Sequence, residues 1–119
     1  MHPQLEILLQ IQDLKAQRRE LLEGEDARQV QRDEFGLDVE DATAQLDEKV
    51  VELEEELDPQ TRSRYRRLAS GLNRVVVPAV NGTCYGCFVA VPTAVASDPD
   101  ERNRLTSCGH CGRFLYFVA

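Results

Sequence analysis

Apolar residues recur at helical spacing through the first half of the chain. Residues 3–58 contain proline only at position 3 and are rich in Glu, Gln, Leu and Ala, which favour helix. The apolar positions form two stripes, and the second stripe is out of phase with the first. The first stripe is Ile7, Ile11, Leu14, Leu21 and Leu22, and the second is Val39, Ala42, Leu46, Val50, Leu53 and Leu57.

Two architectures are compatible with this change of phase. In the one we favour, the chain turns back near residues 35–38 and two helices pack as an antiparallel hairpin. Gly36 would then end the first helix and Asp38 would cap the second. In the other, one continuous helix passes through a stutter and pairs with a second copy of the chain. The sequence therefore leaves a homodimer open.

A third helix is predicted to begin at Asp58-Pro59, with Asp as N-cap and Pro at the first helical position, and to extend to about residue 73. Its buried face is expected to be Thr61, Tyr65, Leu68 and Leu72. Five arginines with no acidic residue among them surround this face: Arg62, Arg64, Arg66, Arg67 and Arg74. They are candidate contacts for nucleic acid or a protein partner. The alternative is that they form ion pairs with the acidic helices.

After Arg74 the pattern becomes that of β-strands. Residues 75–77 and 79–80 are apolar, Asn81-Gly82 is a turn dipeptide, and Pro78 is expected to place this strand at a sheet edge. Residues 88–91, 105–107 and 114–118 complete a small antiparallel sheet, and residues 97–101 form a loop or helix start capped by Asp98.

These elements predict a mostly α, α+β fold with three parts. Residues 1–58 form an acidic coiled-coil hairpin, residues 59–74 a basic connecting helix and residues 75–119 a small β ribbon. The sheet is too slight to fold unaided, so we expect it to depend on a metal ion.

The four cysteines of the chain predict that metal site. They form two pairs, Cys84-x-x-Cys87 and Cys108-x-x-Cys111, separated by the twenty residues 88–107. This is the upper edge of the spacing typical of four-cysteine zinc sites. Two turns of this kind can place four sulfurs around one ion, so we expect one structural Zn²⁺.

Other uses of the cysteines fit the sequence less well. Two disulfides would suit a secreted protein, but residues 1–10 lack the features of a signal peptide, which indicates a cytoplasmic protein. A thioredoxin-like redox pair would need a βαβ context. His110 lies between two of the cysteines, and we expect it to face solvent.

Charge divides the chain, whose net charge is −7. Residues 1–58 carry 18 acidic and 6 basic residues, whereas residues 59–119 carry 3 acidic and 8 basic residues. Such asymmetry is typical of two interaction surfaces or of one region that recognises nucleic acid. Arg113 joins the candidate contacts, while Tyr85, Phe88 and Tyr116 are expected in the ribbon core rather than stacked on bases. No apolar run is long enough to cross a membrane.

The second half of the chain resembles the bacterial C4-type zinc ribbon domain family over residues 59–117. The matching motifs are Tyr65-x-x-Leu68, the apolar residues 75–80, Cys84-x-Gly86-Cys87 and Cys108-Gly109-x-Cys111-Gly112-Arg113-x-Leu115-Tyr116. In that family the ribbon follows a helical hairpin, which is far longer than the helical region here. Some members contact an alternative sigma factor, and one is described as binding messenger RNA. The resemblance implies a non-enzymatic adaptor in transcription or RNA regulation, with a sigma factor or RNA polymerase as partner.

Two other function classes fit the sequence less well. A DksA-type regulator of RNA polymerase also joins a helical hairpin to a four-cysteine zinc site, and Asp38-x-x-Asp41-Ala42 approaches the acidic tip motif of such proteins. An enzyme is not expected. Four cysteines leave no open position on a zinc ion, and the chain has no Ser-His-Asp set, phosphate loop or dinucleotide fingerprint.

Overall fold

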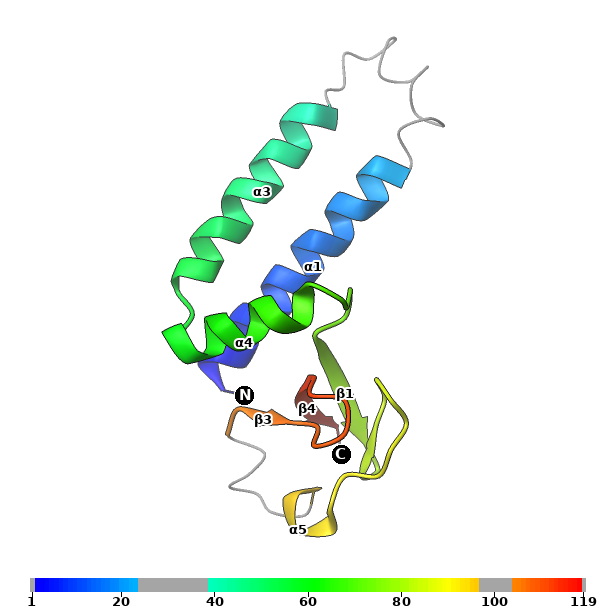
Figure 1. Cartoon of the computed structure of the whole chain (residues 1–119). Coiled ribbons are helices and arrows are strands. Elements are labelled where there is room, and N and C mark those ends of the chain that lie inside the picture. Colours follow the sequence, from blue (N-terminus) through cyan, green and yellow to red (C-terminus); the bar gives the residue numbers. More distant parts are fainter. Residues whose placement is uncertain (1, 24–38, 97–103, 119) are drawn as a thin grey trace.

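The structure, a computed structural model, describes residues 2–23, 39–96 and 104–118. The helices are α1 (Pro3–Glu23), α3 (Val39–Glu55), α4 (Pro59–Ala69) and the short α5 (Thr93–Ala96). The strands are β1 (Val76–Val80), β2 (Thr83–Cys84), β3 (Thr106–Ser107) and β4 (Phe114–Val118). The predicted α+β class, with long helices first and strands last, is confirmed (Figure 1). The predicted turn at residues 35–38 and the Asp98 cap lie outside the described residues.

Helices α1 and α3 form an antiparallel hairpin, as favoured from the sequence (Figure 1). Arg18, near the end of α1, pairs with Asp47 in the middle of α3 at 2.8 Å. At the start of α1, the side chain of Gln4 reaches Glu56 and Asp58, which follow α3. Because early residues of α1 meet late residues of α3 and beyond, the continuous-helix alternative is excluded.

The buried face of α1 differs from the predicted stripe. Its buried residues are Leu5, Leu8 and Ile11. Ile7 and Leu14 are only half-buried, and Leu22 is 43% exposed. The first half of α1 packs against α4 and the sheet as well as against α3, so its buried face follows the whole core rather than one hairpin seam. In α3 the prediction is confirmed where it enters that core, at Val50 and Leu53.

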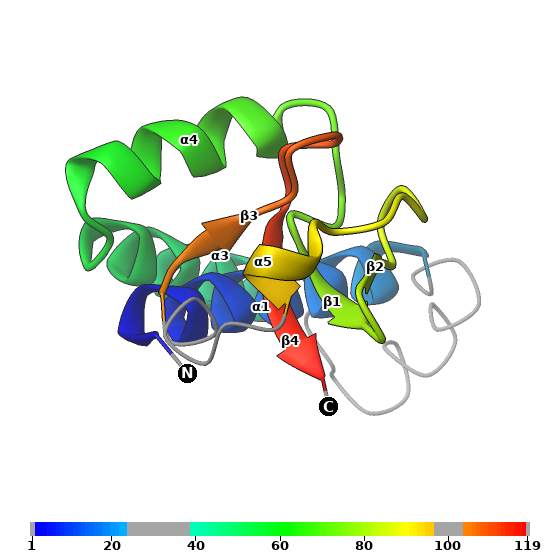
Figure 2. The ribbon, with the colours of Figure 1, turned by 90° about the horizontal axis from the view of Figure 1, so that it is seen from below.

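Helix α4 crosses in front of the first half of α1, and the sheet lies beside the base of the hairpin, in direct contact with α1 (Figures 1 and 2). It begins at Pro59 as predicted, but Asp58 makes no side-chain capping bond, and the helix ends at Ala69. Tyr65 is buried with residues of α1, α3 and the sheet. The members of this shared core are Leu5, Leu8, Ile11, Val50, Leu53, Leu57, Tyr65, Val75, Val76 and Phe114. The three predicted parts of the chain therefore share one hydrophobic core.

The sheet is mixed, with strand order β2-β1-β4-β3. Its two outer pairs are antiparallel, but the central strands β1 and β4 are parallel. The expectation of an antiparallel sheet is therefore wrong for the central pair. The reason is the long connection between β1 and β4, which passes through both cysteine pairs and α5 before the chain re-enters the sheet in the same direction as β1.

Pro78 lies in an interior strand, so the prediction of an edge strand is also wrong. The β2 ladder pairs only with Ala79 and Val80, and it therefore ends beside the proline. The carbonyl oxygen of Pro78 still accepts a bond from the N–H of Tyr85 at 3.0 Å. Proline has no backbone N–H to donate, and at this position the sheet requires no further hydrogen bond from β1. The Asn81-Gly82 turn is confirmed, with φ of 52° and 77°.

One glutamine joins the hairpin to the sheet. The side-chain oxygen of Gln12 accepts hydrogen bonds from the N–H groups of Val75 and Val76, at 2.7 and 2.8 Å. Its amide nitrogen donates to the carbonyl oxygen of Val76 at 3.0 Å. These bonds satisfy backbone groups at the start of β1 that would otherwise be left without partners. The position of the sheet is thereby fixed relative to α1.

Candidate metal centre

Two backbone turns present the cysteines, and they fold alike. We call residues 84–89 the first cysteine turn and residues 108–113 the second. In the first turn, the N–H of Cys84 donates to the carbonyl of Val89, and the N–H of Phe88 donates back to the carbonyl of Cys84 at 2.7 Å.

The second turn repeats both bonds at equivalent positions. The N–H of Cys108 donates to the carbonyl of Arg113 at 2.8 Å, and the N–H of Gly112 donates to the carbonyl of Cys108 at 2.9 Å. The same pattern of bonds brings both sulfurs of each turn to one side of the backbone.

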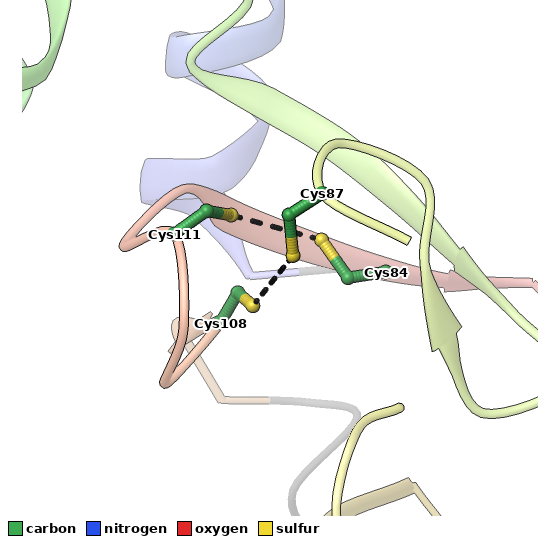
Figure 3. A group of neighbouring side chains, drawn as sticks. All are labelled: Cys84, Cys87, Cys108 and Cys111. Carbon is green, nitrogen blue, oxygen red and sulfur yellow. Dashed lines mark hydrogen bonds between the residues drawn. The ribbon is translucent and has the colours of Figure 1, made fainter. Parts of the chain in front are cut away.

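The four sulfurs converge at one point between the turns (Figure 3). The Sγ atoms of Cys84 and Cys111 lie 3.8 Å apart, and those of Cys87 and Cys108 lie 3.7 Å apart. All four sulfurs are within 4.8 Å of one another, while Cys84 and Cys108 are buried. The cysteine pairs predicted from the sequence are therefore brought together by the fold.

This geometry fits a metal ion and not a pair of disulfides. Sulfurs held about 2.3 Å from a tetrahedral ion are separated by about 3.8 Å, close to the two shortest separations here. A disulfide would need sulfurs about 2.05 Å apart, and all four cysteines are free. The cluster can thus bind one metal ion with four sulfur ligands.

The protein environment affects the thiols unequally. Burial raises the pKa of Cys87 to about 12; a backbone hydrogen bond from Val89 opposes this, while hydrogen bonds with the other three thiols act in the same direction as burial. Burial acts to raise the pKa of Cys108 too, but hydrogen bonds from the backbone of Cys111 and His110 outweigh it and lower that pKa to about 7. The N–H of Gly86 also points at the sulfur of Cys84, at 3.4 Å. Backbone N–H groups directed at sulfur favour the thiolate form that a metal requires.

One backbone position in the turns is unusual. Gly112 has φ of 78°, and the equivalent residue of the first turn, Phe88, has φ of 61°. A residue with a Cβ atom is strained in this region, whereas glycine is not. No sequence pattern indicates that an aromatic residue occupies this left-handed position.

The aromatic residues near the cysteines lie differently from the prediction. Phe88 is 71% exposed and Tyr85 is 44% exposed, so neither belongs to the ribbon core. Their rings are 5.7 Å apart and tilted by 40°. Only Tyr116 packs against the core, half-buried. His110 is exposed, as expected, and the group of metal-ligating residues found in the described parts of the chain does not include it.

Arg62, one of the candidate contacts, has a structural role. Its guanidinium donates to the carbonyl oxygens of Glu54, Glu55 and Leu57, at 2.8, 2.9 and 3.0 Å. These carbonyls lie at the end of α3 and just after it, where a helix lacks partners of its own. Arg62 therefore caps α3 and fixes the corner between α3 and α4.

The other candidate arginines remain near the surface. Arg64 lies over the ring of Phe114, 5.4 Å from its centroid. The Nε of Arg113 donates to the carbonyl of Arg74 at 2.9 Å. Arg66, Arg67 and Arg74 are exposed. Among the residues that the structure describes, none of the six arginines forms an ion pair with the acidic hairpin, so the ion-pair alternative is not supported there.

The sequence analysis did not identify a second basic group. Lys15, Arg18 and Arg19 lie together on α1, although residues 1–58 are strongly acidic overall. Arg18 pairs with Asp47, and the other two line a small pocket at the base of the hairpin. Three basic residues within five positions were a readable signal, which the net charge of the region obscured.

Comparison with known proteins identifies the overall shape but no family. No protein-family model matches the chain, and no curated protein matches it significantly. A solved structure, that of CT398 from Chlamydia trachomatis, is similar with a TM-score of 0.56 and 28% sequence identity. The similarity covers 84% of this chain and 44% of that one, so the chain spans less than half the length of CT398. No described helix is both long and apolar enough to cross a membrane.

Proposed function

We propose that the four cysteines hold one structural Zn²⁺ and that the chain is a short member of the C4-type zinc ribbon family. The observation that carries this proposal is the sulfur cluster, whose 3.7 and 3.8 Å separations match the edges of a tetrahedral zinc–thiolate site. Zinc is the metal expected for four cysteine ligands in a small β module. Metal analysis of the purified chain should return one zinc per chain, and iron in its place would overturn the assignment.

In this proposal the zinc site is structural and the chain is an adaptor rather than an enzyme. Four thiolates complete the coordination of zinc, so no position remains for a water molecule or a substrate. The chemistry left to the protein is recognition by its surface. The role we infer is in bacterial transcription or RNA regulation, in a reducing compartment such as the cytoplasm where cysteines stay free.

Two surfaces are available for partners. The acidic hairpin would contact a protein, such as a sigma factor or RNA polymerase, or a second copy of the chain. The exposed arginines Arg66, Arg67 and Arg74, with Arg64 and Arg113 beside them, would contact RNA or DNA phosphates. Arg62 is set apart from this group because its donors already bond the end of α3.

The nucleic-acid part of the proposal is tested by the salt dependence of binding. An arginine that contacts phosphate releases counterions, so affinity for an RNA oligonucleotide should fall as salt rises. Removing one such contact should reduce the slope of log K against log salt by about 1. We expect Arg66→Gln with Arg67→Gln to flatten the slope, and Lys49→Gln on the exposed hairpin to leave it unchanged. A flat response in the unmodified chain would remove RNA and DNA from the proposal.

The protein-partner part needs the full chain. Val76 and Phe114 of the sheet pack in one core with Leu8 and Ile11 of α1. A fragment lacking residues 1–58 would therefore expose apolar surface and bind partners non-specifically. Surface variants of the intact chain are the better probe: reversal of exposed acidic residues such as Glu48 and Glu52 should abolish capture of the partner if the hairpin binds it.

The DksA-like alternative keeps one supporting observation, the antiparallel hairpin next to a four-cysteine cluster. Its tip residue Asp38 lies outside the described residues, while Asp41 is in the first turn of α3. This alternative requires binding to core RNA polymerase without a sigma factor. Failure of the tagged chain to co-purify with core polymerase would discard it.

A further inference from the structure

Two aromatic side chains of the first cysteine turn lie together on the surface, whereas the sequence predicted both in the ribbon core. Phe88 is 71% exposed and Tyr85 is 44% exposed. Their ring centroids are 5.7 Å apart and the rings are tilted by 40°, so the two faces do not cover each other. Apolar side chains that are grouped on a surface are typical of binding sites, whereas single exposed ones are common everywhere.

The backbone holds both rings in fixed positions. The N–H of Tyr85 donates to the carbonyl of Pro78 in β1 at 3.0 Å, and the N–H of Phe88 donates to the carbonyl of Cys84 at 2.7 Å. Phe88 has φ of 61°, which is unfavourable for a residue with a Cβ atom. Its exposed ring gains no burial in return, and such strain is typical of functional positions. Aromatic side chains on a fixed backbone lose little conformational freedom when they bind a ligand.

Two arginines adjoin the aromatic pair. The side chain of Arg113 lies against Gly86, which separates the two aromatic residues in the chain, and a Cβ atom there would be 2.8 Å from Cδ and 3.0 Å from Nη1 of Arg113. The Nε of Arg113 donates to the carbonyl of Arg74 at 2.9 Å, so the exposed Arg74 is its neighbour. This bond occupies one of the five guanidinium donors of Arg113. In the part of the chain that the structure describes, no ion pair engages either arginine.

We call Tyr85, Phe88, Arg74 and Arg113 the aromatic–arginine patch, and its composition favours a nucleic-acid strand. The described residues 59–96 and 104–118 contain no aspartate or glutamate, so no acidic side chain from α4 or the sheet opposes an anion there. Arginine pairs with phosphate, and an aromatic ring stacks on a base. A nucleic-acid strand alternates phosphate and base in every unit, whereas an acidic protein segment does not repeat this pattern. The bases of a duplex are stacked on each other, so only a single strand offers its base faces to the rings.

We propose that the aromatic–arginine patch binds single-stranded nucleic acid, with bases stacked on Phe88 and Tyr85 and phosphates bound by Arg113 and Arg74. This inference rests on the nucleic-acid binding proposed above. It adds the type of strand, the contact with bases and a site beside the first cysteine turn, where the arginines alone would bind any phosphate backbone. Little preference for sequence is expected, because every base has a face on which a ring can stack.

The test measures binding of the intact, zinc-loaded chain to three labelled RNAs of equal length by fluorescence anisotropy. The RNAs are a single-stranded oligouridine, a duplex, and an abasic strand that keeps every phosphate but has no bases. Because stacking contributes to binding of the first RNA alone, we expect oligouridine to bind about 5-fold more tightly, or better, than the duplex or the abasic strand at one salt concentration. All three affinities should fall as salt rises.

Variants separate the rings from the charges. Phe88→Leu, which keeps an apolar side chain but removes the ring, should weaken oligouridine binding about 5-fold or more and leave the salt slope unchanged, whereas Phe88→Tyr should retain the affinity. Arg113→Gln should instead reduce the slope by about 1 for all three RNAs. The matched control is Val51→Ala, which removes an exposed apolar side chain from α3 and should change nothing.

A spectroscopic measurement on the unmodified chain does not depend on the folding of any Phe88 variant. The chain has no tryptophan, so its intrinsic fluorescence comes from its three tyrosines. Stacking of a base on Tyr85 should quench part of this fluorescence. Tyr85→Phe should remove that quenching and keep the affinity, because the ring is retained.

Failure of this inference is distinguishable from failure of the proposed function. Salt-dependent binding that is equal for oligouridine, duplex and abasic RNA, or that survives Phe88→Leu without loss, would overturn base stacking and leave arginine binding to phosphate in place. Binding of oligouridine without any quenching of tyrosine fluorescence would exclude Tyr85 from the site. A chain that binds none of the three RNAs would overturn both proposals, and the exposed aromatic pair would then be a contact for protein.

Discussion

The first and second cysteine turns share the same backbone hydrogen bonds but differ in the residue at the left-handed position. At the left-handed position the second turn has Gly112, with φ of 78°, and the first has Phe88, with φ of 61°. An L-residue there is less stable by about 1–2 kcal/mol. The second turn is therefore relaxed, whereas the first is held in a strained conformation by its hydrogen bonds.

The surroundings of the two turns explain part of this difference. A Cβ atom at Gly112 would lie 3.6 Å from the side chain of Leu68, so the second turn packs beneath α4. The first turn faces solvent, with Phe88, Tyr85 and Val89 all exposed. Burial cannot offset the strain at a side chain that is 71% exposed. The second turn packs into the fold. The first turn instead exposes an apolar surface that folding does not require.

Loss of the metal should have the largest effect and should abolish the likeness of the two turns. Structural zinc contributes about 10–16 kcal/mol of apparent binding free energy in small modules, far more than any side chain considered below. We expect a chelator to remove hydrogen-exchange protection from β1 and β4. Acid should have the same effect, because protonation of the cysteine thiolates releases the ion.

Cysteine variants test whether both turns are needed equally. Cys84→Ser in the first turn and Cys108→Ser in the second should each reduce bound zinc to well below one per chain.

For the chelation experiment, a sheet that keeps its hydrogen-exchange protection after chelation would show that the shared core, with Val76 and Phe114, suffices without metal.

Substitution of the glycine in the relaxed turn should have the next largest effect. Gly112→Ala places a Cβ atom at φ of 78° with only ordinary contact to Leu68, so the loss should come from backbone strain. We expect the free energy of unfolding of the zinc-loaded chain to fall by about 1–2 kcal/mol. Gly109→Ala is the control, because a Cβ there meets nothing within 4 Å. Equal effects of the two substitutions would contradict the role of φ.

The two turns also show how far the sequence could be read. The Cys-x-x-Cys spacing was enough to predict four sulfurs around one point, because a two-residue spacer restricts how a turn can direct its side chains. The phase change between the stripes of α1 and α3 was compatible with a hairpin or a continuous helix, and Gly36 with Asp38 favoured the hairpin. The parallel direction of β1 and β4 could not be predicted in this way, since no local sequence pattern shows how the long connection between the two strands folds.

Other features could not be predicted from the sequence because they depend on tertiary contacts. Arg62 looks like its exposed neighbours in the sequence, and only the meeting of α3 with α4 makes it a helix cap. The expectation that Phe88 lies in the ribbon core is wrong, because its side chain is 71% exposed. Its exposure results from the left-handed backbone after Cys87, which turns the side chain outward.

Relief of strain in the first turn should stabilise the protein. Phe88→Gly gives the first turn the residue of the second, and we expect the free energy of unfolding to rise by up to about 1 kcal/mol. The gain is limited by the flexibility of glycine in the unfolded chain and by loss of the ring contact with Tyr85. Denaturant unfolding at saturating zinc measures it, with Tyr85→Ala as a control that removes the ring contact alone. A marked loss of stability in Phe88→Gly would mean that the exposed ring supports the fold.

The smallest expected effect concerns the glycine within the first pair. A Cβ atom at Gly86 would lie 2.8 Å from the Cδ of Arg113, a side chain from the second turn. Since Arg113 is long and only half-buried, it can shift, and Gly86→Ala should destabilise the chain by about 0.5–1 kcal/mol, at or below the low end of overpacking effects. In an Arg113→Ala background the same substitution should become nearly neutral. If the two changes instead add without coupling, the two turns do not constrain each other through this contact.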